Sequence, residues 1–97
     1  MTYIVEQTEP FAKWHYALRD LRAKAAIIRR IIRAENGNLG DVKPVGCDVS
    51  EMRIDVGPGY RVYFTVRGGL VVILLAGGDK STQQADIKRA IELAKEI

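Results

Sequence analysis

An unbroken apolar run, Leu70–Ala76, constrains the fold of this chain more than any other segment. Strands that are apolar at every position are typical of the centre of a sheet covered on both faces. The run is far shorter than the ~20 apolar residues that a membrane-spanning helix needs. The chain has 97 residues, of which 47% are hydrophobic, and this favours a packed core over disorder. We therefore expect one domain, residues 1–97, built around a buried central strand.

Two segments before this run alternate between apolar and polar residues, which is typical of strands with one buried face. They span residues 50–56 and 60–66, and the turn Gly57-Pro58-Gly59 separates them. We expect Val56 to pair with Tyr60 across the turn. The further expected pairs are Ile54–Val62 and Met52–Phe64 on an apolar face that meets the helices, and Arg53–Tyr63 and Asp55–Arg61 on a solvated face that also carries Glu51.

The first third of the chain predicts a strand and two helices. Residues 2–8 are rich in β-branched residues and predict the strand. A first helix is expected over residues 10–18, with Pro10 in its first turn, and a second one up to about Glu35. We expect Asp20 to cap the second helix, which makes the pair an αα-hairpin.

The last third predicts a helix after the central strand. Gly77-Gly78 should break the strand, and Ser81 with Gln84 has the spacing of a capping box. The helix is then expected from about Thr82 to Lys95. One short strand near Pro44 stays open, because proline confines that segment to a sheet edge or a turn. The order of elements indicates an α+β fold with a mostly antiparallel sheet of four to five strands.

Basic residues concentrate in the second helical segment. The formal net charge is +3, yet residues 19–33 hold six positive charges against the single acid Asp20. At about 100° per residue, Arg22, Arg29 and Arg33 fall on one line, and Arg19 and Arg30 lie beside it. The line is either a solvated helix face or a platform for a phosphate backbone or an acidic protein.

Apolar residues form a wide sector next to this basic line. The face next to the line carries Leu18, Leu21, Ala25, Ile28 and Ile32, and Ile27 and Ile31 widen it. The width of the sector is compatible with coverage of part of it by another chain.

The polar face of the predicted hairpin supplies candidate site residues. Arginine binds phosphate with two parallel hydrogen bonds and tyrosine stacks on bases, so Arg53, Arg61 and Tyr63 suit a nucleic acid. Cross-strand ion pairs on a solvated sheet face are the alternative, and these contribute little to stability. Lys80, next to the start of the last helix, is either a loop lysine in solvent or a cation that joins Arg61 and Tyr63 around a scissile phosphate.

Several classes of enzyme are not supported by the composition. His15 is the single histidine and is expected at the surface, and Cys47, the single cysteine, is expected to be an incidental or structural thiol. The paired glycines lack the pattern of a P-loop or a dinucleotide site. We expect no metal, no cofactor and no signal peptide, and a soluble cytoplasmic protein that does not bind membranes.

Four stretches carry a family resemblance that extends over nearly the whole chain. They are GNLGDVK at 37–43, EMRI at 51–54, GPGYRVYF at 57–64 and GGDKSTQ at 77–83. In these stretches the chain resembles the addiction-module killer proteins, HigB-like toxins of the RelE/ParE superfamily. The resemblance implies the compact RelE/ParE-like fold and a HigA-like helix-turn-helix antitoxin, with DNA contacted only through that antitoxin.

Two activities are known within this superfamily. HigB- and RelE-like members cleave mRNA in the ribosomal A site without a metal, whereas the ParE branch inhibits DNA gyrase and is not a nuclease. The resemblance therefore implies a ribosome-dependent endoribonuclease, with a gyrase inhibitor or an inert antitoxin-binding subunit as alternatives.

The resemblance also implies roles for residues. The matching catalytic positions are Arg53, Arg61, Tyr63 and Lys80, with Glu51 a further candidate. Contacts with RNA and the ribosome are expected from Arg19, Arg22, Arg29, Arg30, Arg33 and Lys43. No histidine lies near the C-terminus, so Tyr63 or Lys80 would have to move protons. Their ordinary pKa lies near 10, and cationic surroundings would have to lower it.

Overall fold

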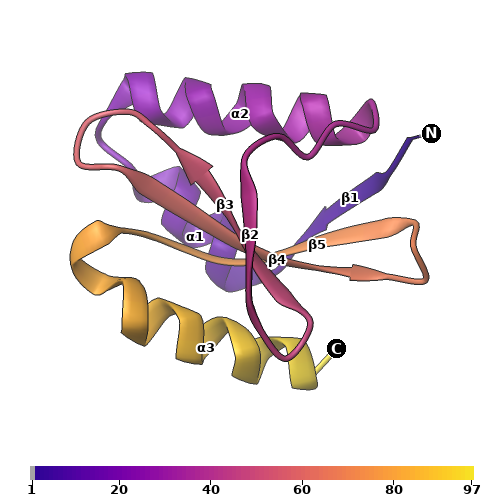
Figure 1. Ribbon diagram of the computed structural model, residues 1–97. Helices are drawn as coiled ribbons and strands as arrows, with labels where there is room; N and C mark the ends of the chain where they lie inside the picture. Colours follow the sequence, from indigo (N-terminus) through magenta and orange to yellow (C-terminus); the bar gives the residue numbers. More distant parts are fainter. Residues whose placement is uncertain (1) are drawn as a thin grey trace.

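Five strands form one sheet in the order β1-β5-β4-β3-β2 (Figure 1). The computed structural model describes residues 2–97. The strands are β1 Ile4–Gln7, β2 Val42–Gly46, β3 Val49–Ile54, β4 Tyr60–Arg67 and β5 Val71–Asp79. Only the β1–β5 pair is parallel, so the sheet is mostly antiparallel. The strand near Pro44, which the sequence leaves open, is present as β2 at the sheet edge.

Helices cover both faces of this sheet (Figure 1). They are α1 Glu9–Ala17, α2 Leu21–Glu35 and α3 Gln83–Lys95, and a 3-10 turn, η1 Lys80–Thr82, leads into α3. One core cluster joins α1 and α2 to the sheet, and a second joins α3 to the opposite face. The expected α+β fold, with its N-terminal strand, two-helix hairpin and C-terminal helix, is confirmed. Within residues 2–97, no helix combines the length and apolar character needed to cross a membrane.

β5 is the buried central strand that the apolar run predicts. Val72 and Leu74 belong to the cluster under α1 and α2, and Leu75 and Ala76 belong to the cluster under α3. Leu75 is an extra residue in the pairing with β4, where a bulge shifts the register. Because a bulge interrupts the alternation of side chains, consecutive residues Leu75 and Ala76 both contribute to the same cluster.

The strand does not break at Gly77-Gly78 as the sequence predicts; it continues to Asp79. A Cβ on Gly77 would collide with the Trp14 ring of α1, and one on Gly78 would collide with the Asp86 carboxylate of α3. The two glycines therefore serve close packing on both faces of the strand rather than a turn.

The β3–β4 register differs from the expected one by two residues. Ile54 pairs with Tyr60 and Met52 with Val62, so Val56 lies in the loop and not in the ladder. Local hydrogen bonds, from Val56 N to Ile54 O and from Gly59 N to Val56 O, lengthen the loop. Because the side-chain period of a strand is two, this shift keeps each residue on its expected face.

One of the two expected helix caps is confirmed. The Asp20 carboxylate accepts hydrogen bonds from the amides of Arg22 (3.0 Å) and Ala23 (3.1 Å), which caps α2. The capping box of Ser81 and Gln84 is wrong, because α3 starts at Gln83 and its N-cap, Thr82, forms no side-chain cap. A 3-10 turn intervenes, and Asp79 caps that turn instead.

The apolar residues of α2 divide between two sides of the helix. The buried ones are Ala23, Ala26, Ile27 and Ala34. Leu21, Ile28 and Ile32 are 75%, 46% and 50% exposed, so this part of the wide apolar sector lies outside the core of the chain.

Candidate functional site

Two arginines stand opposite each other on the face of the sheet that carries α3. The register pairs Arg53 of β3 with Arg61 of β4, and like charges in this position repel. The Glu51 carboxylate resolves the repulsion: its Oε2 lies 2.8 Å from Arg61 Nε and 3.4 Å from Arg53 Nε. Neither nitrogen meets hydrogen-bond geometry, so the contacts are ion pairs. Glu51 thus holds both cations in one cluster.

The side chains of the cluster differ in solvent exposure, from the buried Glu51 to Arg53 at an open rim. The Glu51 side chain is 4% exposed, whereas those of Arg61 and Arg53 are 12% and 39% exposed. Gln83, at the start of α3, donates a hydrogen bond to Glu51 Oε1 at 3.2 Å. This face is therefore partly covered by α3 and is not the solvated face that the sequence predicts. The buried carboxylate leaves the arginines oriented towards solvent.

Tyr63 lies beneath this cluster. It is fully buried, and its hydroxyl has no hydrogen-bond partner within residues 2–97. Burial, and then the negative charges of Glu51 and Asp86, raise the pKa of Tyr63 to about 12, although Arg61 opposes the shift. Of the two residues that the sequence offers for proton transfer, Tyr63 therefore does not have the lowered pKa that this role requires. In this position the hydroxyl is a poor proton acceptor near neutral pH.

Gly59 brings Lys80 next to the arginine cluster. The Lys80 amide donates to Gly59 O at 3.1 Å, which ties the start of η1 to the β3–β4 loop. A Cβ on Gly59 would lie 3.6 Å from both Arg61 Nη1 and the Lys80 side chain. Lys80 is exposed, and within residues 2–97 it forms no ion pair. Three of the four expected catalytic residues therefore lie in one region: Arg53 and Lys80 are accessible at an open rim, and Arg61, which is largely buried, borders it beside Lys80.

Arg30 differs from the other arginines of α2, with which the sequence groups it. Its guanidinium donates to the carbonyl oxygens of Leu39 (3.1 Å), Asp41 (3.2 Å) and Arg53. Burial, with the charge of Arg33, lowers its pKa. Arg30 thus fastens α2 to the sheet, and its donors are not free for RNA.

The remaining expected RNA-contacting residues lie on two different faces. Arg22, Arg29 and Arg33 are exposed on α2, and Arg19 is exposed in the link between α1 and α2. A hollow of about 320 Å³ beside Arg29 and Arg33 continues to the start of the β3–β4 loop. Lys43 is exposed on β2 and pairs with Glu51, which places it on the face of the arginine cluster. The sheet therefore separates most of the basic surface from the candidate site.

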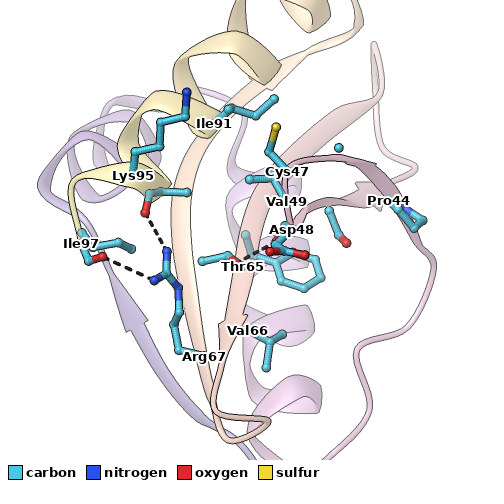
Figure 2. A pocket seen from close by; sticks show the side chains of 14 residues that line it. Pro44, Cys47, Asp48, Val49, Thr65, Val66, Arg67, Ile91, Lys95 and Ile97 are labelled. Atoms are coloured by element: carbon cyan, nitrogen blue, oxygen red, sulfur yellow. Dashed lines mark hydrogen bonds between the residues drawn. The ribbon is translucent and has the colours of Figure 1, made fainter.

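A groove of about 750 Å³ opens elsewhere on the α3 side (Figure 2). It lies between the β2–β3 turn, β4 and the C-terminal end of α3, and Cys47 is an exposed thiol on its lining. Arg67 lines it and donates to Ala94 O (2.6 Å) and Ile97 O (3.4 Å). None of the clustered site residues lines this groove, so it is separate from the candidate site.

His15 is not the surface residue that the sequence predicts. Its ring stacks on Phe11, with centroids 5.9 Å apart and an interplanar angle of 4°. Its Nε2 lies 3.3 Å from Lys24 O. His15 therefore links α1 to α2 and takes no part in the arginine cluster.

Sequence comparison identifies relatives along the whole chain. The chain is 52% identical over 97 residues to an uncharacterized protein of Haemophilus influenzae, which covers 100% of this chain and 98% of that protein. The profile of one family, described as phage derived protein Gp49-like (DUF891), matches residues 17–97.

Comparison of structures identifies the fold. The free state of an E. coli RelE toxin carrying two arginine-to-alanine substitutions superposes with a TM-score of 0.69 at 19% identity. The match covers 92% of this chain and 98% of that chain. The fold is RelE-like, and by sequence the chain belongs to the phage-derived Gp49-like family (DUF891).

Proposed function

We propose that this protein is the toxin of a type II toxin–antitoxin module and a ribosome-dependent, metal-independent endoribonuclease that cleaves mRNA in the A site. The RelE-like fold and the resemblance to HigB-like toxins support this assignment. The observation that carries it is the group of Arg53, Arg61 and Lys80 above the buried Glu51 carboxylate, in which Arg53 and Lys80 are accessible and Arg61 is largely buried at the edge. Such a rim suits a dianionic phosphorane, because cationic side chains offset the negative charge that develops on it.

The proposed reaction is a transesterification. The ribose 2′-oxygen attacks the adjacent phosphorus and gives up its proton to solvent water, and the bond from phosphorus to the 5′-oxygen breaks. The products are a 2′,3′-cyclic phosphate and a 5′-hydroxyl, which takes up a proton. Arg61 and Arg53 hold the phosphate oxygens and offset the charge that develops on them.

Lys80 is the residue that we propose to exchange protons with the substrate. Its ammonium is exposed on the rim, whereas the Tyr63 hydroxyl is fully buried and has a raised pKa. A protonated lysine can supply the proton that the 5′-oxygen takes up. Tyr63 then supports the rim from below and does not touch the reacting atoms.

The surroundings of the site suggest what the partners do. The ribosome would position the mRNA, and such positioning supplies several kcal/mol of the barrier reduction. Exposed Arg19, Arg22, Arg29 and Arg33, with Lys43, would contact RNA phosphates. Action on ribosomes places the protein in the cytoplasm, and a HigA-like helix-turn-helix antitoxin would neutralise it and contact DNA.

Primer extension on a defined mRNA bound to purified ribosomes tests the proposal. Wild-type protein should cut in the A site, and the ends should be a 2′,3′-cyclic phosphate and a 5′-hydroxyl. Lys80→Ala should slow cleavage by about 10²- to 10⁴-fold, the usual range for a lost acid or base. Arg53→Ala should slow it by about 10²- to 10³-fold. Lys88→Ala, which removes an exposed lysine of α3, is the matched control and should cut normally.

Two results would contradict the proposal. Absence of cuts by the wild-type protein, together with inhibition of supercoiling by DNA gyrase, would make it a ParE-like inhibitor. Absence of both activities, with normal growth when the protein is expressed alone, would make it an inert antitoxin-binding subunit.

A further inference from the structure

α2 carries a second apolar stripe on the side that faces away from the sheet. Leu21, Ala25, Ile28 and Ile32 are all exposed, the three larger ones by 46% or more. At about 100° per residue, the four lie within roughly 60° of one another. The centre of this stripe lies roughly 170° from the middle of the buried side of the helix. The stripe therefore cannot contribute to the core of this chain.

The spacing of the stripe matches that of a helix–helix seam. The four residues follow each other at intervals of four, three and four, as core positions do in coiled coils. They span about 16 Å along the helix axis, which corresponds to three turns of a partner helix. The stripe thus has the geometry to receive one helix along its length.

The charges beside the stripe define the partner. Arg22, Arg29 and Arg33 follow one edge of it, and all three are exposed. Lys24 lies at the other edge, where its ammonium sits 5.3 Å from the centre of the Tyr16 ring. A second copy of this chain would bring the same cations against each other, and that repulsion disfavours a symmetric pair. Acidic side chains would complement this edge.

We propose that α2 is a docking surface for an amphipathic helix of another protein, one that places an apolar seam on Leu21, Ala25, Ile28 and Ile32 and acidic residues against Arg22, Arg29 and Arg33. Charge complementarity selects this partner over a basic helix or a second copy. The docking lies on the sheet face opposite the arginine cluster (Figure 1), so it leaves Arg53, Arg61 and Lys80 uncovered.

Docking has a consequence that depends on the proposed function. An acidic helix on α2 occupies the arginines that we propose for ribosomal RNA, so the partner and the ribosome would exclude each other. The partner would then neutralise the protein by preventing ribosome binding and not by plugging the site. The docking itself requires no nuclease activity.

Titration of the ¹⁵N-labelled full chain with two synthetic peptides tests the docking. The probes are a helical peptide with a leucine seam flanked by glutamates and the same peptide with lysines in place of the glutamates. The acidic peptide should shift amide resonances of α2, and its affinity should fall as salt rises. Ile28→Asp should weaken binding at least tenfold. Leu70→Asp is the matched control, because Leu70 is 47% exposed at the β4–β5 turn, and it should bind normally.

Each of five results would overturn the proposal. The first two are that the lysine peptide binds as well as the acidic one, and that neither peptide binds at millimolar concentration. The third is that the shifts fall on the groove beside Cys47 and Ile97 and not on α2. The fourth is a dimer in sedimentation that Ile28→Asp dissociates, which would make the occupant a second copy. The fifth is sedimentation of the protein with phosphatidylserine vesicles through α2, which would make the surface a membrane contact.

Discussion

Glu51 determines the electrostatics of the candidate site, although it is the least accessible charged residue there. Two arginines face each other across β3 and β4, and their repulsion is offset only by this carboxylate. Without it, the site would consist of two cations at close range with no anion beneath them. A bound phosphate would add a second negative charge on the open side of the arginines. The buried carboxylate thus offsets part of the positive charge of the two arginines.

Glu51→Gln tests this view, because it keeps the shape of the side chain and removes its charge. We expect the free energy of unfolding to fall by about 1–3 kcal/mol, since Arg61 is left largely buried without a counter-ion. Urea denaturation measures the change. Glu92→Gln, at an exposed position of α3, should change stability by no more than about 0.5 kcal/mol. Equal effects of the two substitutions would mean that Glu51 does not organise the arginines.

Tyr63 offers a test that separates structure from chemistry. Its hydroxyl is buried without a partner, so Tyr63→Phe should leave stability at pH 7 unchanged or raise it by about 1 kcal/mol. If Lys80 exchanges the proton, cleavage should stay within about threefold of wild type. A loss of about 10² or more in rate would restore Tyr63 as a catalytic residue.

The raised pKa of Tyr63 also predicts an alkaline loss of stability. Below about pH 10 the tyrosine is protonated in both states, and above that value the unfolded chain ionises first. With a folded pKa of about 12, the free energy of unfolding falls between pH 10 and 12, by at most about 2–3 kcal/mol. Denaturation at stepped pH should show that Tyr63→Phe lacks this part of the loss. Tyr16→Phe, at a residue that is 83% exposed, should retain it.

At the scale of elements, the features that depend on local sequence pattern were predicted, and those that depend on contacts between distant segments were not. Alternation identified the faces of β3 and β4, and the apolar run identified β5, because both signals are local. The register of the hairpin was wrong by two residues, since loop hydrogen bonds at Val56 and Gly59 decided it. The sequence shows a wide apolar sector on α2, and only the fit against the sheet decides which part of it is buried.

The candidate site shows the same difference between local sequence signals and contacts with distant elements. Arg53, Arg61 and Lys80 could be named as candidates because a family resemblance marks them and because strand alternation places the two arginines on one face. The burial of Tyr63 and the use of Arg30 as an anchor were missed, because each depends on an element distant in sequence. α3 covers the first, and the carbonyls of the loop before β2 and of β3 receive the second.

Gly77 shows how one residue sets the fit between two elements. Gly77→Ala should cost about 1–3 kcal/mol, because the new methyl group collides with the Trp14 ring and displaces α1. The cost should shrink by at least half in a Trp14→Leu background, where the ring is absent. A double-mutant cycle by thermal or urea unfolding measures this coupling. An equal cost in both backgrounds would show that backbone strain at Gly77, and not the ring, limits the position.

At the scale of the whole molecule, the sheet separates two faces that both carry exposed basic residues. The arginine rim and Lys80 lie on the α3 side, and the exposed arginines of α2 lie on the other side (Figure 1). The exposed charges of α2 and the arginine rim therefore lie on opposite faces of the sheet. We expect the two faces to govern different kinetic constants, with the rim setting the chemical step and α2 setting the affinity for the ribosome.

Neutralising Arg22, Arg29 and Arg33 together, each to Gln, separates the two faces. The ribosome concentration for half-maximal cleavage should rise at least tenfold, while kcat stays within about twofold. The slope of log affinity against log salt should fall by about two, because three phosphate contacts are lost. A triple substitution of Lys88, Arg89 and Lys95 to Gln removes the same charge from exposed positions of α3 and is the matched control. If both triples raise KM equally, net charge alone drives association and α2 is not a specific contact. If the α2 triple lowers kcat with KM unchanged, the arginines act on the chemical step and the division into two faces is wrong.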